Sequence, residues 1–321
     1  MSTEDYKFTL EAKYLKKAKD ELNENDSDRM DAIEALKNWI NEQKHLKYPT
    51  GKYYTINLLR ILRYAKFSQI KARQTIENVI QFAFKYPDIF FNIDTTDETF
   101  LKIAKTGHCI PLPGYDDEGR KVLLFRSSAL PFEHALKEYG IDAYMRSFRG
   151  CFLSLFQDEM TQINGVVLIL DMTGLSLRSM TKMNDPKFKS IEKDSQEAII
   201  GRLKSFHFYN IGGLFEAFFT LCKAVMKKKL IERVKVHVNL ETMYSSIPKR
   251  MLPDEYLSDD YTGPSAGSIQ HLIDLEVKRL TSEKCRNYVQ QQFKRERYFY
   301  DPNLKPREST VVQHFRKLNV D

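Results

Sequence analysis

The residues of this chain that could do acid–base or nucleophilic chemistry do not form a recognisable catalytic set. Asp171 follows the apolar run 166–170, where open parallel sheets place their sites, and His207 and His237 lie inside two further strand candidates. A hydrolase also needs an activated nucleophile, yet the sequence contains no GxSxG elbow, HExxH motif, P-loop or GxGxxG turn. We therefore expect these side chains to be core or cap residues and the protein not to be an enzyme.

The cysteine pattern gives no sign of a metal centre. The four cysteines are widely spaced and include no CxxC pair, which argues against a zinc cluster and against a disulfide framework. The N-terminus has no apolar stretch of signal-peptide length, and no run approaches the roughly 20 apolar residues that span a bilayer. We expect a reduced, soluble, cytoplasmic protein without a metal.

The segment 211–226 is the most unusual in the chain, because as a helix it would be apolar nearly all round. Its side chains other than Glu216, Thr220 and Lys223 are apolar or small. Such a helix is either fully buried, or a lid whose inner face lines an apolar cavity and whose outer face touches a membrane. Gly212 and Gly213 at its start would suit a hinge.

A basic cluster borders this segment. The chain has 50 Lys and Arg against 43 Asp and Glu, a net charge of +7, and residues 221–250 alone hold eight basic and two acidic residues. An apolar helix beside such a cluster favours an anionic membrane surface. Nucleic acid is the rival polyanion, but no RNP, KH or zinc-finger pattern is present, so we expect no nucleic-acid partner. The cluster consists of Arg202, Lys204, Lys227, Lys228, Lys229 and Arg233, with Lys235 nearby.

The elements that position these residues change in kind along the chain. Helical periodicity and a closing Pro87 predict an all-helical lobe over residues 1–95. Four strand candidates then follow, separated mostly by helical stretches, which predicts an α/β domain over 96–267 with a mostly parallel sheet covered by helices. A polar helix and tail make up 268–321. The strand candidates are 121–125, 166–170, 203–209 and 234–238.

Seven motifs, in order, resemble the CRAL-TRIO lipid-transfer family. Residues 58–67 (LLRILRYAKF) are similar to its LLRFLRARKF, and 117–122 (DEGRKV) to its DxxGRPV turn and strand. Residues 164–176 resemble NGxxxIxDxxGLS, and 204–210 (KSFHFYN) resemble KxIHxIN. Residues 86–90, 266–269 and the ending 315–321 complete the set, the last two most like insect alpha-tocopherol-transfer-protein-like and cellular retinaldehyde-binding-like proteins.

This resemblance implies a CRAL-TRIO α/β/α lipid-binding domain in which residues 211–226 are a mobile gate helix over a hydrophobic ligand cavity. It also implies that Arg202, Lys204, Lys229 and Arg233 bind phosphoinositide headgroups beside the gate. The second Arg of the family's LRAR motif is Ala65 here, so the phosphate cluster is either weakened or rebuilt from Lys66.

Two segments depart from the family pattern. The LPxEYGG turn appears either as 252–256 or, altered and more acidic, as 257–263. The cavity-wall helix reads IEKDSQEAI over 191–199 where relatives carry aliphatic residues. Asp194 and Ser195 fall near the wall unless the helix is rotated by a residue, and a buried Asp or Ser would need a hydrogen-bond partner from ligand or water.

The sequence therefore predicts a non-enzymatic carrier that moves a small hydrophobic ligand, such as a tocopherol, retinoid, carotenoid or other lipid, between membranes. Period-two alternation puts Phe206 and Phe208 on one sheet face and His207 on the other. The alternative is a phosphoinositide-dependent adaptor with a small or empty cavity. We favour a monomer that associates peripherally with anionic, phosphoinositide-bearing membranes. The expected ligand contacts are Phe148, Phe152, Leu155, Leu168, Leu170, Asp194, Ser195, Phe206, Phe208, Leu214, Phe215, Phe218, Phe219 and Cys222.

Overall fold

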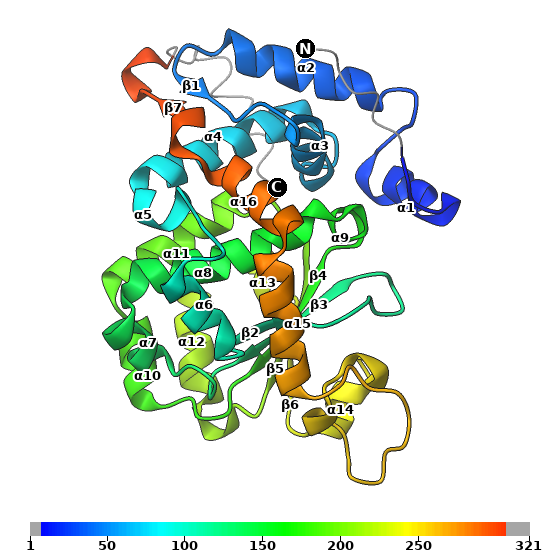
Figure 1. Ribbon diagram of the computed structural model, residues 1–321, viewed down its shortest axis with the longest axis vertical. Coiled ribbons are helices and arrows are strands. Elements are labelled where there is room, and N and C mark those ends of the chain that lie inside the picture. Colours follow the sequence, from blue (N-terminus) through cyan, green and yellow to red (C-terminus); the bar gives the residue numbers. More distant parts are fainter. Residues whose placement is uncertain (1–7, 306–321) are drawn as a thin grey trace.

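The computed structural model describes residues 8–305 and begins with a layer of helices (Figure 1). The predicted ending at 315–321 lies outside the described residues. The polar cap of α4 is Ser68, whose hydroxyl accepts from the Lys71 amide at 3.3 Å. The N-terminal helices are α1 (Ala12–Leu22), α2 (Arg29–Glu42), α3 (Tyr54–Tyr64), α4 (Gln69–Lys85), the short α5 (Pro87–Phe90) and α6 (Glu98–Lys105).

A five-stranded sheet follows, in the order β2-β3-β4-β5-β6. The strands are β2 (Cys109–Pro111), β3 (Lys121–Arg126), β4 (Val166–Asp171), β5 (Leu203–Tyr209) and β6 (Val234–His237). β3 to β6 are parallel neighbours, whereas β2 pairs antiparallel with β3. The four predicted strands and the mostly parallel α/β class are thus confirmed, and β2 is an edge strand that the sequence analysis missed.

The two faces of the sheet serve two separate cores. Leu168 and Phe206 belong to a large core shared with the N-terminal helices, while Val167 and Ile169 point into a smaller one. The large core is covered by α8 (Gly140–Ser154), α11 (Pro186–Ala198) and α12 (Phe215–Val225), and the small one by α14 (Leu240–Tyr244) and α15 (Ile269–Thr281). The remaining helices are α7 (Phe132–Glu138), α9 (Glu159–Asn164), α10 (Leu177–Met183), α13 (Lys228–Ile231) and α16 (Glu283–Phe293).

The C-terminal segment returns to the N-terminal lobe. In Figure 1 the orange and red α16 and β7 (Phe299–Tyr300) run up beside the blue and cyan helices. β7 pairs antiparallel with β1 (Leu46–Lys47). Tyr288 of α16 accepts a hydrogen bond from Arg60 at 3.1 Å and donates one to Asn57 at 3.2 Å, both inside α3. The beginning and the end of the described chain thus pack as one unit.

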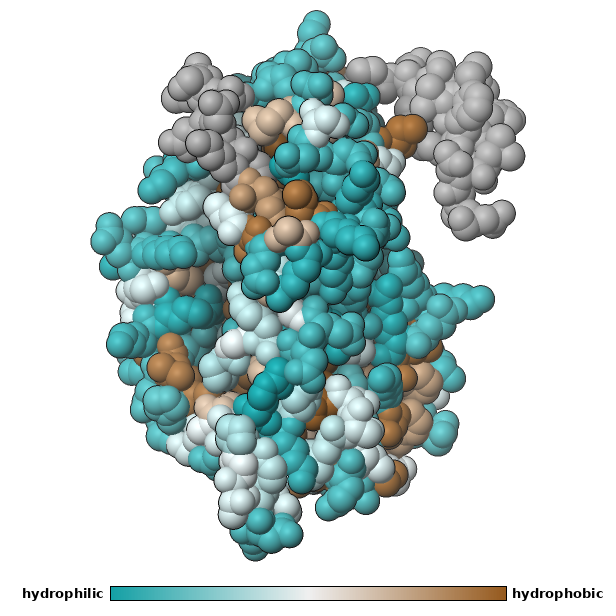
Figure 2. Space-filling view, turned by 90° about the vertical axis from the view of Figure 1, so that its right-hand side faces the viewer, coloured by the Kyte–Doolittle hydropathy of each residue, from teal (hydrophilic) through white to brown (hydrophobic). Residues whose placement is uncertain are grey.

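The face of the molecule drawn in Figure 2 is largely hydrophilic. On the face drawn in Figure 2, hydrophobic residues gather in small separate groups rather than in one continuous area. Of the helices within residues 8–305, none combines the length and the hydropathy needed to cross a bilayer.

Candidate functional site

Helix α12 packs on the sheet, but most of its side chains are half-buried or exposed. Of its 11 residues only Phe218 is buried, and the Phe218 ring packs edge-on against Phe208 of β5 with centroids 5.6 Å apart. Phe215 and Phe219 stack on each other at 5.2 Å and stay half-buried. The exposed positions carry Glu216, Ala217, Thr220, Lys223 and Ala224. The outer side of the helix is therefore less apolar than its sequence suggests.

The helix is held differently at its two ends. At its start, a Cβ added to Gly212 or Gly213 would meet no atom within 4 Å, and Gly212 has a φ of +56° that favours glycine. At its end, the Gln196 side chain of α11 donates to the Val225 carbonyl at 2.8 Å and accepts from the Lys227 amide at 3.0 Å. The end of α12 is fastened to α11, whereas its start lies in open surroundings.

Most of the predicted ligand contacts meet in the core beneath α12. Phe125, Phe148, Phe152 and Phe156 form a row of ring contacts 5.2 to 5.6 Å apart. Leu170 is half-buried although it belongs to the central strand of the sheet. Phe152, Leu155, Leu168, Phe206, Phe208 and Phe218 are buried there, with Phe148, Leu170, Leu214, Phe215 and Cys222 packed half-buried against them.

The structure shows how α11, which was predicted to line the cavity, is rotated about its axis. Asp194 faces α4, where its carboxylate accepts from Lys85 at 2.6 Å and from the Tyr86 hydroxyl at 2.8 Å. Ser195 is buried and donates to the carbonyl of Glu192 at 2.9 Å. Residues two apart on a helix point about 200° apart, so the Glu192 side chain lies on the side away from Asp194. Glu192 is thus the acidic residue on the side of α11 away from α4, and the sequence analysis did not single it out.

The environment of Glu192 is apolar. Burial raises the pKa of its carboxyl group from 4.5 to about 7. Within residues 8–305, no hydrogen bond or ion pair reaches this carboxyl group. The Glu192 residue is only half-buried, so part of its surface remains accessible to solvent. A signal was present in the sequence, since Glu192 falls in a helical stripe with Phe188, Ser195 and Ile199.

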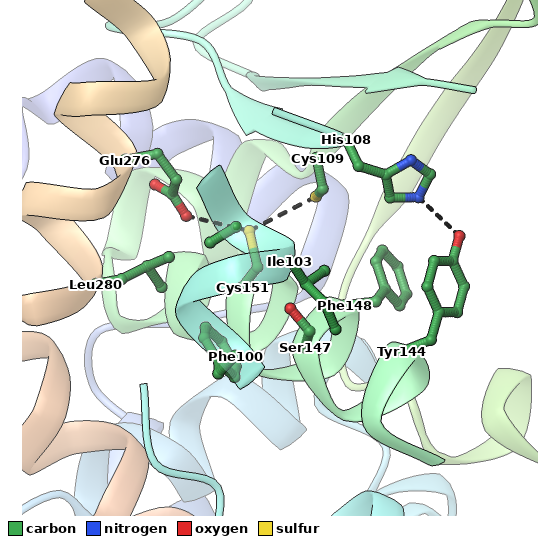
Figure 3. Close-up of a pocket in the computed structure, with 11 residues that line it drawn as sticks. Phe100, Ile103, His108, Cys109, Tyr144, Ser147, Phe148, Cys151, Glu276 and Leu280 are labelled. Carbon is green, nitrogen blue, oxygen red and sulfur yellow. Dashed lines mark hydrogen bonds between the residues drawn. The ribbon is translucent and has the colours of Figure 1, made fainter. Parts of the chain in front are cut away.

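A separate small pocket lies at the edge of the same layer (Figure 3). It holds about 20 Å³, room for a single water molecule, and is lined from α6, α8, β2 and α15. Across it, the ring nitrogen Nε2 of His108 lies 2.7 Å from the Tyr144 hydroxyl, and the Cys151 thiol donates to Glu276 at 3.2 Å. Burial lowers the pKa of His108 to about 4, so the ring is neutral at physiological pH. This pocket is too small for a lipid.

The basic residues meet in a second cavity, between the N-terminal lobe and the sheet domain. Its volume is about 370 Å³. Lys71 and Gln74 of α4 line it from one side, and residues of β5 and α13 line it from the other. Lys71 was not predicted, because only the fold brings α4 to this place; Lys228 was predicted but is not among the lining residues. The predicted cations that line the cavity are Lys66, Arg202, Lys204, Lys227, Lys229 and Arg233.

The cations in this cavity act on one another. Burial first, and then Arg233, Lys71, Lys66 and Arg202, lower the pKa of Lys229. Burial, Lys227 and Lys66 lower the pKa of Lys71 in the same direction. Gathering like charges in this way costs free energy that a bound anion would recover.

Two local features position the cavity wall. Lys66 and Phe67 have φ of +52° and +59°, which non-glycine residues rarely adopt, and this turn joins α3 to α4 with the Phe67 amide bonded to the Leu62 carbonyl at 2.7 Å. Across the cavity, Glu21 of α1 accepts from Arg202 at 2.7 Å and from Lys204 at 3.2 Å. Ala65 is buried, and Lys66 rather than Ala65 lines the cavity.

Asp171, His207 and His237 make structural contacts. Nδ1 of His207 lies 2.8 Å from Nε2 of His237, the rings stack at 5.1 Å, and burial, then His237, lowers the pKa of His207 to about 3. Asp171 accepts from Tyr256 and from the backbone of Thr173 at 2.9 Å. Among residues 8–305 there is no group of three His, Cys, Asp or Glu residues that could hold a metal ion.

Comparison with known proteins agrees with this geometry. Residues 105–256 match the family model described as CRAL/TRIO domain. Alpha-tocopherol transfer protein-like of Mus musculus is 27% identical over 252 residues, which cover 78% of this chain and 71% of that protein. Clavesin-1 of Xenopus laevis is 25% identical over 252 residues, 77% of this chain and 73% of that protein.

A solved structure shares the fold. The crystal structure of Sfh5 superposes with a TM-score of 0.53 at 12% identity, covering 98% of this chain and 100% of that one. The family match covers the five-stranded sheet, α12 and the part of the basic cavity that β5 and α13 line. Residues 105–256 of this chain, which hold the five-stranded sheet and α12, are therefore a CRAL/TRIO domain.

Proposed function

We propose that this protein carries a small hydrophobic ligand in the space beneath α12 and exchanges it with membranes, without chemical change to the ligand. The observation that carries the proposal is the position of α12, a largely apolar helix of which only Phe218 is buried, directly beside a cavity lined by cations. Burying apolar ligand surface there gains about 25 cal/mol per Å².

The basic cavity gives this carrier a membrane contact. Its cations come from both lobes and repel one another, which suits the several negative charges of a phosphoinositide headgroup. Lys227 immediately follows the fastened end of α12, so an anion bound in the cavity lies next to the gate. On a membrane, Phe215 and Phe219 would gain a lipid environment in the open state, and this difference drives opening. The protein would thus work in the cytoplasm and at membrane surfaces.

A second function is favoured by one observation, the aromatic rings that fill part of the core. Phe208 packs on Phe218, and the row from Phe125 to Phe156 occupies the layer under α8. If these rings close the space, the protein would be a phosphoinositide-dependent adaptor with a small or empty cavity.

The test is a lipid extract of the purified full-length protein, analysed by mass spectrometry, together with titration of the fluorescent lipophile Nile red. The carrier predicts a stoichiometric hydrophobic ligand and saturable Nile red binding. If no extract contains such a ligand and Nile red does not saturate, the carrier is contradicted. Binding to phosphoinositide vesicles without either would then favour the adaptor.

A further inference from the structure

Glu192 places a carboxyl group among the apolar side chains of three helices. One turn earlier on α11, Phe188 packs on Phe132 at 4.8 Å, and Phe132 packs on Tyr144 of α8 at 5.5 Å. From α12, Cys222 packs half-buried against the same core. Burial, and then the Glu192 carboxyl, raise the pKa of Tyr144 and bring that of Cys222 to about 12. The carboxyl group therefore lies where α8, α11 and α12 converge.

Among residues 8–305 Glu192 meets no partner, although the other two carboxylates of α11, Asp194 and Glu197, are paired. Lys85 is taken by Asp194 on the opposite side of the helix, and Lys227 by Glu197 at 2.8 Å. The Tyr144 hydroxyl is already 2.7 Å from His108. A carboxylate in an apolar layer without a hydrogen-bond donor is unfavourable, and its partly open surface shows that the missing donor has room to approach.

We propose that Glu192 binds the polar end of the carried lipid, and that it selects an uncharged lipophile ending in a hydroxyl group. This inference rests on the proposed carrier function. A hydroxyl donates to the carboxylate and brings no second charge into the apolar layer. An ether offers no donor, and a fatty acid would bring a second negative charge next to the first.

The experiment compares hexadecanol, its methyl ether and hexadecanoate as displacers of Nile red from the full-length protein at pH 8. The wild type should bind hexadecanol about tenfold or more tightly than the ether, since a hydrogen bond to a charged group contributes about 1.5–3 kcal/mol. Hexadecanoate should bind more weakly than hexadecanol. In Glu192→Leu the preference for the alcohol over the ether should disappear.

Two further variants keep the test decisive. Glu192→Gln retains the shape of the side chain without its charge, and should bind hexadecanoate more tightly than the wild type even if the Leu variant fails to fold. Glu42→Gln, on the exposed side of α2, should leave every ratio unchanged.

The outcomes separate the two proposals. The proposed role of Glu192 is overturned, while the carrier function stands, if the wild type binds Nile red but has equal affinity for hexadecanol, its ether and hexadecanoate. The same holds if Glu192→Gln changes none of the ratios between these three affinities. If the wild type binds none of the probes, the carrier itself is overturned, and the role of Glu192 with it.

Discussion

Individual charged residues divide into those that the fold neutralises and those that it leaves available. Arg63 is buried and bonded to Glu24 at 2.8 Å, Glu159 at 2.9 Å and Gln162 at 2.9 Å, so it joins the N-terminal lobe to the sheet domain. Glu192 has no such arrangement. The contrast indicates that Arg63 stabilises the folded state, whereas the unpaired carboxyl group of Glu192 lowers the stability of the folded state.

Because of Glu192, the free energy of unfolding of the protein should fall as pH rises. Its pKa is about 7 in the folded state and near 4.5 in the unfolded chain, so between these values the folded state holds the additional proton. Glu192→Gln removes this dependence and should be more stable than the wild type by up to about 3 kcal/mol at pH 8, with little difference at pH 4.5. Urea unfolding from pH 4.5 to 8 measures this.

Glu42→Gln serves as the control and should follow the wild-type curve. Parallel pH curves for the wild type and Glu192→Gln would show that the carboxyl group is not buried in an apolar layer.

At the scale of elements, the sequence predicted what local periodicity determines and missed what packing determines. Four strands were found because each is a short apolar run between helical stretches. β2 was missed because it has three residues, includes Pro111 and gains its register only from β3. The rotation of α11 was left open for Asp194 and Ser195, and only the contacts of Asp194 with Lys85 and Tyr86 fix it.

The site shows the same division. Lys66, Arg202, Lys204 and Lys229 were predicted from motif resemblance, whereas Lys71 became visible only when the fold brought α4 to the cavity. The sequence predicted that α12 has an apolar side facing the sheet. It did not predict that small and polar residues form the outer side, because that depends on how the helix is rotated about its own axis. That rotation is set by the packing of Phe218 on Phe208.

Gln196 should limit local unfolding at the end of α12, because its side chain makes two hydrogen bonds to the backbone there. We expect Gln196→Ala to increase amide exchange by up to about 30-fold over residues 220–230, because two hydrogen bonds of about 1 kcal/mol each are lost. Exchange in β4 should not change. Hydrogen–deuterium exchange with mass spectrometry measures both.

Gln270→Ala is the matched control, since Gln270 is exposed on α15 and bonds only to Asp274 of its own helix among the described residues. Equal exchange in the wild type and Gln196→Ala would mean that other contacts hold the helix end.

At the scale of the whole molecule, the basic cavity depends on both lobes being in place. Lys71 and Lys66 come from the helical lobe, and Lys229 and Arg233 from the sheet domain. The C-terminal segment holds the two together through β7 on β1 and Tyr288 on α3. Neither lobe alone presents the full set of cations.

Charge reversal on both sides of the cavity should therefore weaken membrane binding strongly. Lys71→Glu combined with Lys229→Glu should weaken sedimentation with phosphatidylserine and phosphoinositide vesicles by about 30-fold or more, at about 1 kcal/mol per basic residue lost. Nile red affinity should stay unchanged, because neither lysine lies beneath α12.

The control pair is Lys105→Glu with Lys137→Glu, exposed residues on α6 and α7 that do not line the cavity. Equal sedimentation of both double variants would show that membrane binding responds to net charge alone.

The position of Glu21 has a consequence for which anions can enter. Its carboxylate already occupies Arg202 and Lys204, so an arriving phosphate exchanges one anion for another at that end of the cavity. A singly charged headgroup gains little from such an exchange. A headgroup with several phosphates can engage Lys66, Lys71 and Lys229 without disturbing Glu21. Under the proposed membrane contact, we therefore expect Glu21 to make the protein prefer headgroups that carry several phosphates over headgroups that carry one.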